Sequence, residues 1–380
     1  MPAEHILIVN SEYPPIGGGA GNASAYLARH LAQLGRRVTV LTARFSGLPH
    51  DEEKDGVRVV RLPALRSRED RSGTLEQISF LISAALLGLP WLLRLRPQAV
   101  LAFFGAPSGV AVWFWSLFLS LPYIVSLRGG DVPGFRPYDF ARQHRLLAPI
   151  LRRVWRRARA VVANSQGLRS LGAAFEPEVP IAVIPNGVDF EHFQSAQREW
   201  QPARLLFVGR VVYQKGLDVL LEALGGLNEH SWSLTVVGDG PRRAELLAQA
   251  TRLGIAERIT FAGWKSGADL AAAYAAANLF TYASRHEGMP NALLEAMASG
   301  LPAVATRIAG NEELVADSET GLLVPAEDVA ALRAALATLI ADPGLRQRYG
   351  AEARKRVQTR YSWHTVANQY AALLDQAASE

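Results

Sequence analysis

Two carboxylates stand on either side of a turn that suits the start of a helix. The turn lies within Glu287–Glu295, and it places Pro290 where the first turn of a helix tolerates proline. First-turn amides lack partners inside a helix and favour anions; here they belong to Asn291, Ala292 and Leu293. Glu287 and Glu295 can each accept a hydrogen bond from a ligand hydroxyl. The stretch predicts a site for a ligand with an anionic group and hydroxyls, and the plainer alternative is that Glu295 only pairs with a cation.

Two cations follow an apolar strand in a second motif. The strand ends in Phe207-Val-Gly-Arg210, and Gln214-Lys215-Gly216 comes next. Arg210 and Lys215 would therefore lie at the carboxyl end of a strand, before the next helix. Two cations there can neutralise a diphosphate without a metal ion. The alternative is a pair of ordinary surface cations.

A glycine-rich loop follows the first strand. Tyr13-Pro-Pro-Ile-Gly-Gly-Gly-Ala-Gly21 precedes a helix expected over 22–34, so backbone can approach an anion at the helix start. The spacing differs from a dinucleotide fingerprint, and no acidic residue closes the next strand, Val38-Thr-Val-Leu-Thr-Ala. A dinucleotide oxidoreductase is disfavoured. The loop alone leaves a plain turn and a ligand loop equally open.

A cation and a carboxylate follow another apolar strand, in Ser126-Leu-Arg-Gly-Gly-Asp131. Arg128 and Asp131 would lie at its carboxyl end. The sequence has no Asp-x-Asp motif, and its eight histidines lack ligand spacing. We therefore expect chemistry without a metal ion or a cofactor.

Strands alternate with helices along the whole chain, which predicts parallel sheets. One series of apolar runs precedes a polar, aperiodic stretch over 191–203, and a second series follows it. The expected strands are Ile6–Val9, Val38–Leu41, Val57–Arg61, 98–104, 122–127, Ala160–Ala163 and Ala182–Ile184, then Leu205–Val208, Leu234–Val237, Ile259–Phe261, Leu279–Tyr282, Pro302–Ala305 and Gly321–Val324.

The fold class is therefore α/β, with two Rossmann-like doubly wound domains facing across a cleft. We predict an N-terminal domain over 1–190, a linker over 191–203, a second domain over 204–358 and a C-terminal helix within 359–380. Ligands of such sheets bind outside the carboxyl ends of the strands, where all four motifs lie.

Composition narrows the classes of protein further. The chain has 380 residues, a net charge of +5 and no cysteine, so disulfide frameworks and thiolate chemistry are excluded and a reducing cytoplasm fits. The positive excess lies in the N-terminal half, with arginines at 142, 145, 152, 153, 156, 157 and 159. They suit a solvated helix face, or contact with anionic lipid or an acidic acceptor. No motif for binding nucleic acid accompanies them.

Two apolar stretches raise the question of a membrane. No charged residue lies between Arg96 and Arg128, but Pro107 and Pro122 interrupt the stretch, which reads as a buried strand–helix–strand unit. Ile78–Leu93 is interrupted by Pro90, and it predicts a core helix or an exposed apolar face. We expect peripheral contact with a membrane rather than a span.

Together the motifs resemble the retaining glycosyltransferases of family 4, which have the GT-B architecture. The most specific likeness is the E-x7-E element from Glu287 to Glu295. Further landmarks occur in the family's order: Ile184-Pro-Asn-Gly-Val-Asp189, Gly209-Arg210 with Lys215-Gly216, Val237-Gly-Asp-Gly-Pro241 and Phe261-Ala-Gly-Trp264. The resemblance covers nearly the whole chain, and it implies a C-terminal helix that crosses back to the first domain.

The resemblance implies a role for each matching residue. Arg210 and Lys215 would grip the donor diphosphate, Glu295 the nucleotide ribose, and Glu287 the transferred sugar. Backbone would hold sugar and phosphate along Gly288, Met289, Pro290, Asn291, Ala292 and Leu293. Gly240 and Trp264 would border the base, and Gly18 and Gly19 would complete the phosphate pocket from the first domain.

One departure from the family pattern concerns Arg128. Many members have a histidine there, in a His-Gly-x-Asp pattern near the reacting sugar. Arginine stays protonated and cannot act as a general base, but it can stabilise charge on the departing phosphate. Arg128, Asp131 and Glu287 are the residues expected at the reacting centre, without a conventional general base.

The expected activity is metal-independent transfer of a hexose or N-acetylhexosamine from a nucleoside diphosphate sugar, with a UDP-sugar favoured. The acceptor would be a cell-surface glycan or a lipid-linked carrier, and the enzyme would be cytoplasmic at the inner face of the membrane. GDP-mannose is the alternative donor. A nucleotide-sugar epimerase or phosphorylase, or a binding protein without activity, is less favoured. The sequence leaves the oligomeric state open.

Overall fold

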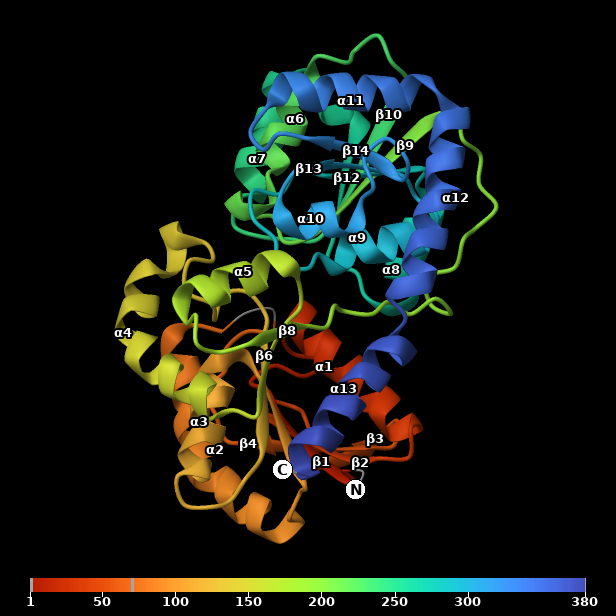
Figure 1. Cartoon of the computed structure of the whole chain (residues 1–380). Coiled ribbons are helices and arrows are strands. Elements are labelled where there is room, and N and C mark those ends of the chain that lie inside the picture. Colours follow the sequence, from red (N-terminus) through yellow and green to blue (C-terminus); the bar gives the residue numbers. More distant parts are fainter. Residues whose placement is uncertain (1–2, 70–71, 380) are drawn as a thin grey trace. The chain divides into compact units, whose positions relative to one another are not determined.

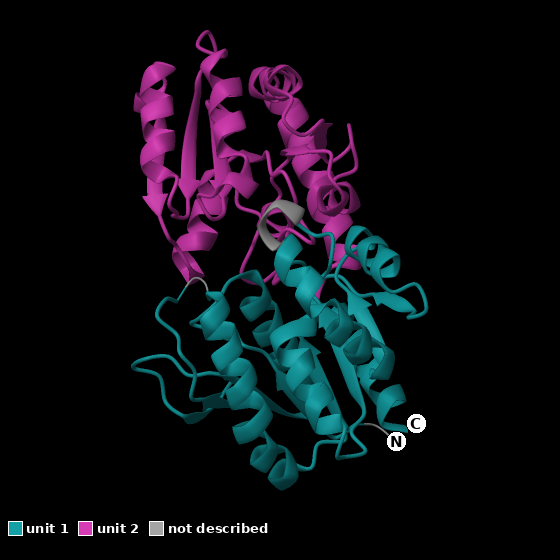
Figure 2. Ribbon diagram, turned by 90° about the vertical axis from the view of Figure 1, so that its left-hand side faces the viewer, with its two compact units in different colours: residues 1–187, 363–380 teal, residues 188–362 magenta. Residues whose placement is uncertain are grey.

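The computed structural model describes residues 3–69 and 72–379, and it divides the chain into two compact units (Figure 2). Unit 1 comprises residues 1–187 and 363–380, and unit 2 comprises residues 188–362. Each unit contains one sheet covered by helices, so the α/β class with two sheet domains is confirmed.

The sheet of unit 1 has eight strands in the order β3-β4-β2-β1-β5-β6-β7-β8. Their bounds are β1 (His5–Val9), β2 (Arg37–Ala43), β3 (Asp51–Lys54), β4 (Val57–Leu62), β5 (Ala99–Phe103), β6 (Tyr123–Leu127), β7 (Ala160–Ala163) and β8 (Ile181–Val183). All pairings are parallel except that of β3 with β4. The sequence analysis missed β3, because its residues, Asp-Glu-Glu-Lys, suit an exposed edge strand and show no apolar pattern.

The helices of unit 1 pack on both faces of this sheet (Figure 1). They are α1 (Gly19–Gln33), α2 (Thr74–Leu95), η1 (Phe104–Gly109), α3 (Val110–Ser116), α4 (Pro137–Arg157), α5 (Gln166–Phe175) and α13 (Trp363–Ser379). In β1, Ile6 and Ile8 belong to the core that contains α1 and α13, whereas Leu7 and Val9 belong to the core that contains α2 and α3. Because successive side chains alternate between faces, a strand covered on both sides is apolar throughout.

The C-terminal helix α13 is part of unit 1. It lies beside α1 (Figure 1), where Trp363 stacks on Tyr26 with ring centroids 5.4 Å apart. Asp375 forms an ion pair with Arg36 at 2.8 Å. A Cβ atom on Gly187 would lie 2.6 Å from the Trp363 ring, so the last residue before unit 2 must be small for α13 to pack there.

The sheet of unit 2 has six strands, all parallel, in the order β11-β10-β9-β12-β13-β14. Its strands are β9 (Ala203–Val208), β10 (Trp232–Val237), β11 (Ile259–Gly263), β12 (Leu279–Tyr282), β13 (Ala303–Thr306) and β14 (Gly321–Val324). Its helices are η2 (Tyr213–Lys215), α6 (Leu217–Gly225), α7 (Arg243–Arg252), η3 (Ala256–Arg258), α8 (Gly267–Ala276), α9 (Asn291–Ala298), α10 (Ala309–Leu314), α11 (Val329–Ala341) and α12 (Pro343–Arg360).

The stretch 191–203, predicted as a linker, packs on unit 2 instead. Phe193 is 5% exposed and sits in the core beside Tyr274. Arg198 donates hydrogen bonds to the carbonyls of Ala277 and Ser299. Polar, aperiodic sequence indicated a linker, but Phe193 and Arg198 anchor the segment to unit 2.

Candidate donor site

Each sheet has one place where the strand order reverses. In unit 2 the chain runs outward from β9 through β10 to β11, and then returns to the other side of β9 with β12. The switch point therefore lies between β9 and β12, and in unit 1 it lies between β1 and β5. Ligands of open α/β sheets bind at the carboxyl ends of the strands at such points.

The switch point of unit 2 brings a predicted cation and a predicted carboxylate into contact. Lys215 lies at the end of η2, after β9, and Glu287 lies in the segment after β12. Lys215 Nζ is 2.6 Å from Glu287 Oε1, and the two side chains are 13% and 8% exposed. The pair has almost no solvent around it, so each group is the other's main electrostatic partner in the chain without ligand.

Tyr282, the last residue of β12, joins this pair. Lys215 Nζ donates to the Tyr282 hydroxyl at 2.6 Å, and that hydroxyl donates to Glu287 Oε1 at 3.0 Å. Burial, followed by the charge of Glu287, raises the pKa of Tyr282 well above its ordinary value. The phenol therefore stays protonated and keeps donating. Sequence reasoning missed Tyr282, although its place at the carboxyl end of a strand was a usable signal.

Glu295 has a tyrosine partner rather than a cation. The Tyr274 hydroxyl, on α8, donates to Glu295 Oε2 at 2.8 Å. Burial raises the pKa of Glu295 to about 7, and the Tyr274 hydrogen bond opposes part of this increase. The alternative in which Glu295 only balances a cation is therefore wrong. The carboxyl titrates near neutrality, as functional carboxyl groups often do.

The segment between β12 and α9 is fixed by an ion-pair network that the sequence did not reveal. Arg285 is 9% exposed and pairs with Asp218 at 2.9 Å and with Glu327. Its backbone amide donates to the Gln214 carbonyl at 2.8 Å, and Gln214 Nε2 donates to the His286 carbonyl at 2.6 Å. The segment with Glu287 is thus tied to the segment with Lys215.

The start of α9 differs in one respect from the expectation. Pro290 is the N-cap, and the amides of Leu293 and Leu294 both donate to its carbonyl, at 3.1 and 3.2 Å. The Leu293 amide is therefore engaged in the helix and unavailable to a ligand, because the first turn is tighter than an ideal α-helical start. Asn291 and Ala292 are partly exposed, whereas Gly288, Met289 and Pro290 are buried.

Glycine allows three pairs of segments in this site to approach each other closely. A Cβ atom on Gly310 would lie 2.5 Å from the Gly288 carbonyl oxygen, and one on Gly240 would lie 2.3 Å from that of Val211. A Cβ atom on Gly216 would lie 1.9 Å from the carbonyl oxygen of Ala283. These glycines therefore shape the site by close backbone contact.

The other predicted residues of unit 2 lie at the same edge of the sheet. Arg210 follows β9, is partly exposed, and has no hydrogen bond or ion pair from its guanidinium to any described residue. Trp264 follows the edge strand β11, and its side chain is 60% exposed. The order β11-β10-β9 puts Trp264 two strands away from the Lys215–Glu287 pair.

In unit 1, the glycine-rich loop lies at the switch point, between β1 and α1. Gly18 is the N-cap of α1, with no side-chain cap, and Gly19 is the first residue of the helix. The Gly18 amide donates to Glu12 Oε2 at 3.3 Å. A carboxylate of the chain itself therefore occupies the anion-favouring position that the sequence predicted for a ligand. Glu12 was not predicted.

Arg128 and Asp131 lie after β6 in unit 1, but their side chains do not pair with each other. Asp131 accepts hydrogen bonds from the amides of Arg128 and Gly129, both at 3.0 Å, and from that of Gly105 at 2.7 Å. The Arg128 guanidinium donates to Asn186 Oδ1 at 2.6 Å and lies over the Phe103 ring. Burial raises the pKa of Asp131 and lowers that of Arg128.

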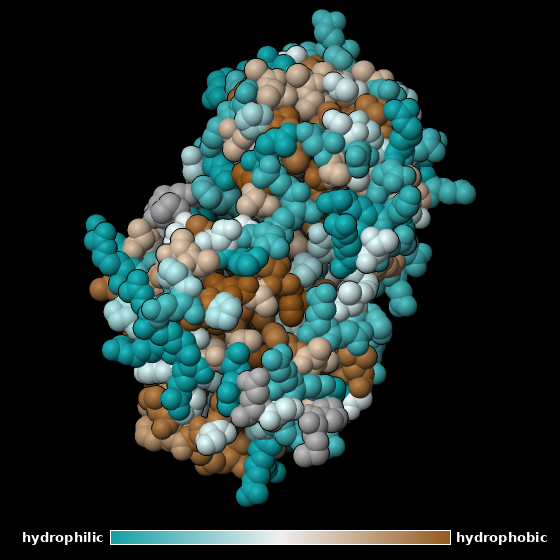
Figure 3. Space-filling view, in the orientation of Figure 1, coloured by the Kyte–Doolittle hydropathy of each residue, from teal (hydrophilic) through white to brown (hydrophobic). Residues whose placement is uncertain are grey.

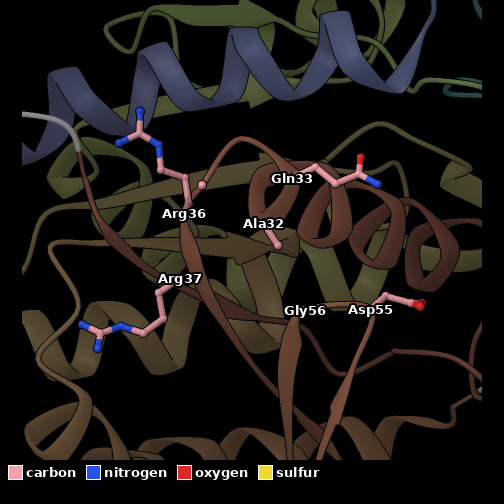
Figure 4. Close-up of a pocket in the computed structure, with 7 residues that line it drawn as sticks. Ala32, Gln33, Arg36, Arg37, Asp55 and Gly56 are labelled. Atoms are coloured by element: carbon pink, nitrogen blue, oxygen red, sulfur yellow. The ribbon is translucent and has the colours of Figure 1, made fainter.

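Figure 4 shows a pocket of about 440 Å³ in unit 1 that none of the predicted site residues line. Its lining includes Gln33, Arg37, Asp55 and Gly56, and Arg37 begins β2. It therefore lies at the amino end of a strand, opposite the edge where ligands of such sheets bind. Among the side chains described in 3–69, 72–136 and 141–379, no group of three or more histidine, aspartate or glutamate residues is placed to hold a metal ion.

Two family models match consecutive parts of the chain. The model described as "Glycosyl transferase 4-like domain" matches residues 18–187, and the one described as "Glycosyl transferases group 1" matches residues 188–356. The chain belongs to the glycosyltransferases of the family 4 type. The border between the two matches coincides with that between units 1 and 2.

Curated relatives and solved structures agree with this assignment. The glycosyltransferase is 29% identical to a glycogen synthase of Mycobacterium tuberculosis over 95% of this chain and 92% of that protein. It is also 29% identical to a GDP-mannose-dependent alpha-(1-6)-phosphatidylinositol monomannoside mannosyltransferase of Mycolicibacterium smegmatis, over 97% and 98% of the two chains. Sucrose-phosphate synthase from Thermosynechococcus elongatus has the same GT-B fold, with a TM-score of 0.88, 22% identity and 99% coverage of both chains.

Proposed function

We propose that this glycosyltransferase moves a hexose or N-acetylhexosamine from a nucleoside diphosphate sugar to a glycan or lipid-linked acceptor, with retention of configuration. The observation that carries the proposal is the Lys215–Tyr282–Glu287 cluster at the switch point of unit 2. A buried ammonium suits a diphosphate, and a carboxylate beside it suits the hydroxyls of a sugar.

In this proposal, donor binding changes the partner of Lys215. Without donor, Lys215 Nζ bonds to Glu287 and Tyr282. With donor, the Lys215 ammonium and the Arg210 guanidinium both bind the diphosphate, and Glu287 accepts hydrogen bonds from the sugar. Glu295 binds the ribose, and the segment from Gly288 to Ala292 contacts sugar and phosphate through its backbone. Leu293 contributes its side chain to the core and no free amide.

The proposed reaction takes place on one face of the sugar. The bond from the anomeric carbon to the phosphate oxygen breaks, and the acceptor oxygen forms the new bond on that same face. The acceptor proton passes to the departing phosphate oxygen. The cations stabilise the negative charge that develops on the diphosphate, which is commonly the largest contribution to catalysis. Arg128 supports that charge from unit 1, and Asp131 acts as a positioning residue for the turn that holds Arg128.

For the donor, we keep a UDP-sugar as the first candidate and GDP-mannose as the second. A specific observation favours the second: the mannosyltransferase of M. smegmatis, 29% identical along nearly the whole chain, is named as GDP-mannose-dependent. That relative acts on a phosphatidylinositol mannoside by its name, which also supports a lipid-linked acceptor. We place the enzyme in the cytoplasm, peripheral to the membrane.

A thermal-shift panel tests the proposal and chooses the donor. UDP, GDP, ADP and their common sugars are added one at a time, each with and without EDTA. A ligand at a hundredfold excess over its Kd stabilises the folded protein by about 2.7 kcal/mol. We expect one base to raise the melting temperature, equally with EDTA present, and the Lys215→Ala variant to lose that increase. If no nucleotide stabilises the protein, the proposed donor class is wrong.

A further inference from the structure

Helix α2 of unit 1 carries apolar residues on two opposite faces. The inner face, at spacings of four, packs in the core through Phe80, Ala84, Gly88 and Leu92. The outer face, at spacings of three, four and seven, remains exposed through Leu75, Ile78, Ile82, Leu86 and Leu93, which are 76%, 46%, 54%, 60% and 53% exposed. We call these five residues the α2 stripe. A helix that is apolar all round is ordinarily buried on all sides.

The stripe is long and has apolar neighbours. Leu93 lies eighteen positions after Leu75, which corresponds to roughly 27 Å of helix. Helix α3 packs beside α2, and the turn after it exposes Leu117 and Phe118, at 47% and 70%. Figure 3 shows this region as a brown patch at the lower left, over α2 and α3. A contiguous apolar surface on this scale marks an interaction site.

The packing of α2 decides how the helix can meet a membrane. By length and composition it is apolar enough to cross one. However, a Cβ atom on Gly88 would lie 2.6 Å from the Trp115 ring, and Trp115 Nε1 donates to the Ala85 carbonyl at 2.9 Å. If α2 crossed the membrane, unit 1 would lose this contact and the core that packs against the helix. The helix can only lie flat, with the stripe outward.

Cations border the stripe. Helix α2 has no charged residue from Gln77 to Leu93, and the exposed Arg94 and Arg96 follow at once. On the other side, Arg157 of α4 donates to Ser116 Oγ at 2.9 Å, directly before the exposed Leu117. From residue 141 to its end, α4 contains six arginines and no acidic residue. Figure 3 shows the corresponding hydrophilic region beside the brown patch.

We propose that the α2 stripe docks unit 1 onto an anionic lipid bilayer, lying in the interface plane with its cations among the headgroups. Binding to such a bilayer increases with the buried apolar area and with the attraction of cations to anionic lipids, and the stripe and the bordering arginines supply these two contributions. The core of a protein interface would instead be enriched in aromatic residues and methionine, which the stripe lacks. The inference builds on the proposed function, since it gives the surface that brings the enzyme to a lipid-linked acceptor, but docking needs no turnover.

Vesicle co-sedimentation of the full chain tests the proposal. The probes are vesicles of phosphatidylglycerol with phosphatidylethanolamine, and vesicles of phosphatidylcholine alone. The test variant is Ile78→Ser/Ile82→Ser/Leu86→Ser. The matched control is Leu65→Ser/Leu146→Ser/Leu247→Ser, which changes three leucines outside the stripe that are 68%, 79% and 48% exposed. A second variant, Arg94→Gln/Arg96→Gln, removes two bordering charges only.

We expect the wild-type chain and the control to bind the anionic vesicles. The stripe variant should bind at least about tenfold more weakly, because three aliphatic side chains no longer enter the interface. The arginine variant should lose about tenfold on anionic vesicles and nothing on phosphatidylcholine. The melting temperatures of all three variants should match that of the wild type, because the altered side chains are exposed.

Three results would overturn the proposal. One is equal vesicle binding by the stripe variant and the wild type, and another is no vesicle binding by the wild type. The third is a wild-type dimer, seen by sedimentation velocity without lipid, that the stripe variant dissociates, because the stripe would then cover a second copy. Failure of the proposed function is a separate result: Lys215→Ala should lose the nucleotide-dependent thermal shift and still bind vesicles.

Discussion

Charged side chains at the switch point of unit 2 pair with each other, whereas the carboxylates that follow β1 and β6 in unit 1 accept hydrogen bonds from backbone amides. In unit 2, Lys215 and Glu287 form an ion pair from the segments that follow the neighbouring strands β9 and β12. In unit 1, Glu12 accepts from the Gly18 amide, and Asp131 accepts from three amides around its turn. Both sheets have a switch point, but the charged groups near it make different contacts.

The difference indicates how the two units divide the task. A charged pair with little solvent can exchange its partner when a charged ligand arrives, which suits the binding of a diphosphate sugar. A carboxylate that holds amides instead fixes the shape of a loop. We therefore expect changes in unit 2 to affect donor chemistry most, and changes in unit 1 to act through the loops and surfaces that they shape.

The largest expected effect is that of Lys215→Ala. Loss of the ammonium should lower kcat by about 10²- to 10³-fold, because the charge on the departing diphosphate loses a preorganised partner. Lys215→Arg should recover part of the rate. The control is Arg252→Ala, which removes an exposed cation at the end of α7. Steady-state transfer assays measure all three. An unchanged kcat in Lys215→Ala would show that the charged pair of unit 2 does not carry the donor chemistry.

Gly18→Ala tests the part of unit 1 in donor binding. Gly18 has a φ of −124°, and a Cβ atom there would meet nothing within 4 Å, so the fold should tolerate the methyl group. If the loop contacts the donor phosphate, KM for the donor should increase about tenfold at an unchanged melting temperature. The matched control is Gly73→Ala at the N-cap of α2, with a φ of −83°. Equal KM values in both variants would assign the donor to unit 2 alone.

Glu295 should make donor binding depend on pH. Burial raises its pKa from 4.5 to about 7, so the carboxyl becomes a full acceptor for ribose hydroxyls only as the pH rises through about 7. The donor Kd should fall several-fold from pH 6 to pH 8, and Glu295→Gln should flatten this profile. Calorimetric titration measures both; a sloping profile in Glu295→Gln would assign the titration to another group.

The same group affects stability in the opposite direction. The folded chain holds a proton that the unfolded chain releases near 4.5, so the contribution of Glu295 to stability is complete below that pH and is lost as the pH rises through about 7. The free energy of unfolding of the wild type, measured with denaturant, should therefore decrease between about pH 4.5 and pH 7 relative to that of Glu295→Gln, which lacks this titration. Above about pH 7 the two free energies should change with pH in parallel.

The smallest expected effect is that of Trp264→Ala. The ring is 60% exposed, so its removal should leave the melting temperature unchanged. If the ring stacks on the base, the donor Kd should increase about threefold to tenfold, corresponding to about 1 kcal/mol. Competition binding with the preferred nucleotide measures it. An unchanged donor Kd in Trp264→Ala would limit the donor site to the strands next to the switch point.

The sequence was sufficient for two domains with parallel sheets and for the position along the chain of each described strand except β3. The expected strand Leu205–Val208 lies within β9, because a short uninterrupted apolar run between helices is typical of a strand that is buried on both faces. It also indicated the segments that meet at the switch point of unit 2, since motifs after β9 and β12 must share one edge.

Sequence reasoning failed where contacts depend on distant partners. Nothing in the chain near Glu295 indicates Tyr274, which lies 21 residues away on α8. The sequence around Arg285 is compatible with an ordinary surface cation, and only the folded chain shows its ion pairs with Asp218 and Glu327. The amide of Leu293 was expected to be free, and the tight first turn of α9 engages it.

By itself the sequence determined which segments follow the carboxyl ends of the strands, because the alternation of strand and helix is local. Only the tertiary structure decided what those residues touch: Lys215 on Glu287, Glu12 on the Gly18 amide, and no protein partner for the α2 stripe among the described residues. The physical reason is that the hydrophobic period and the spacing of residues specify strands, helices and their sequence along the chain. Charge pairing and burial depend instead on which distant segments pack together.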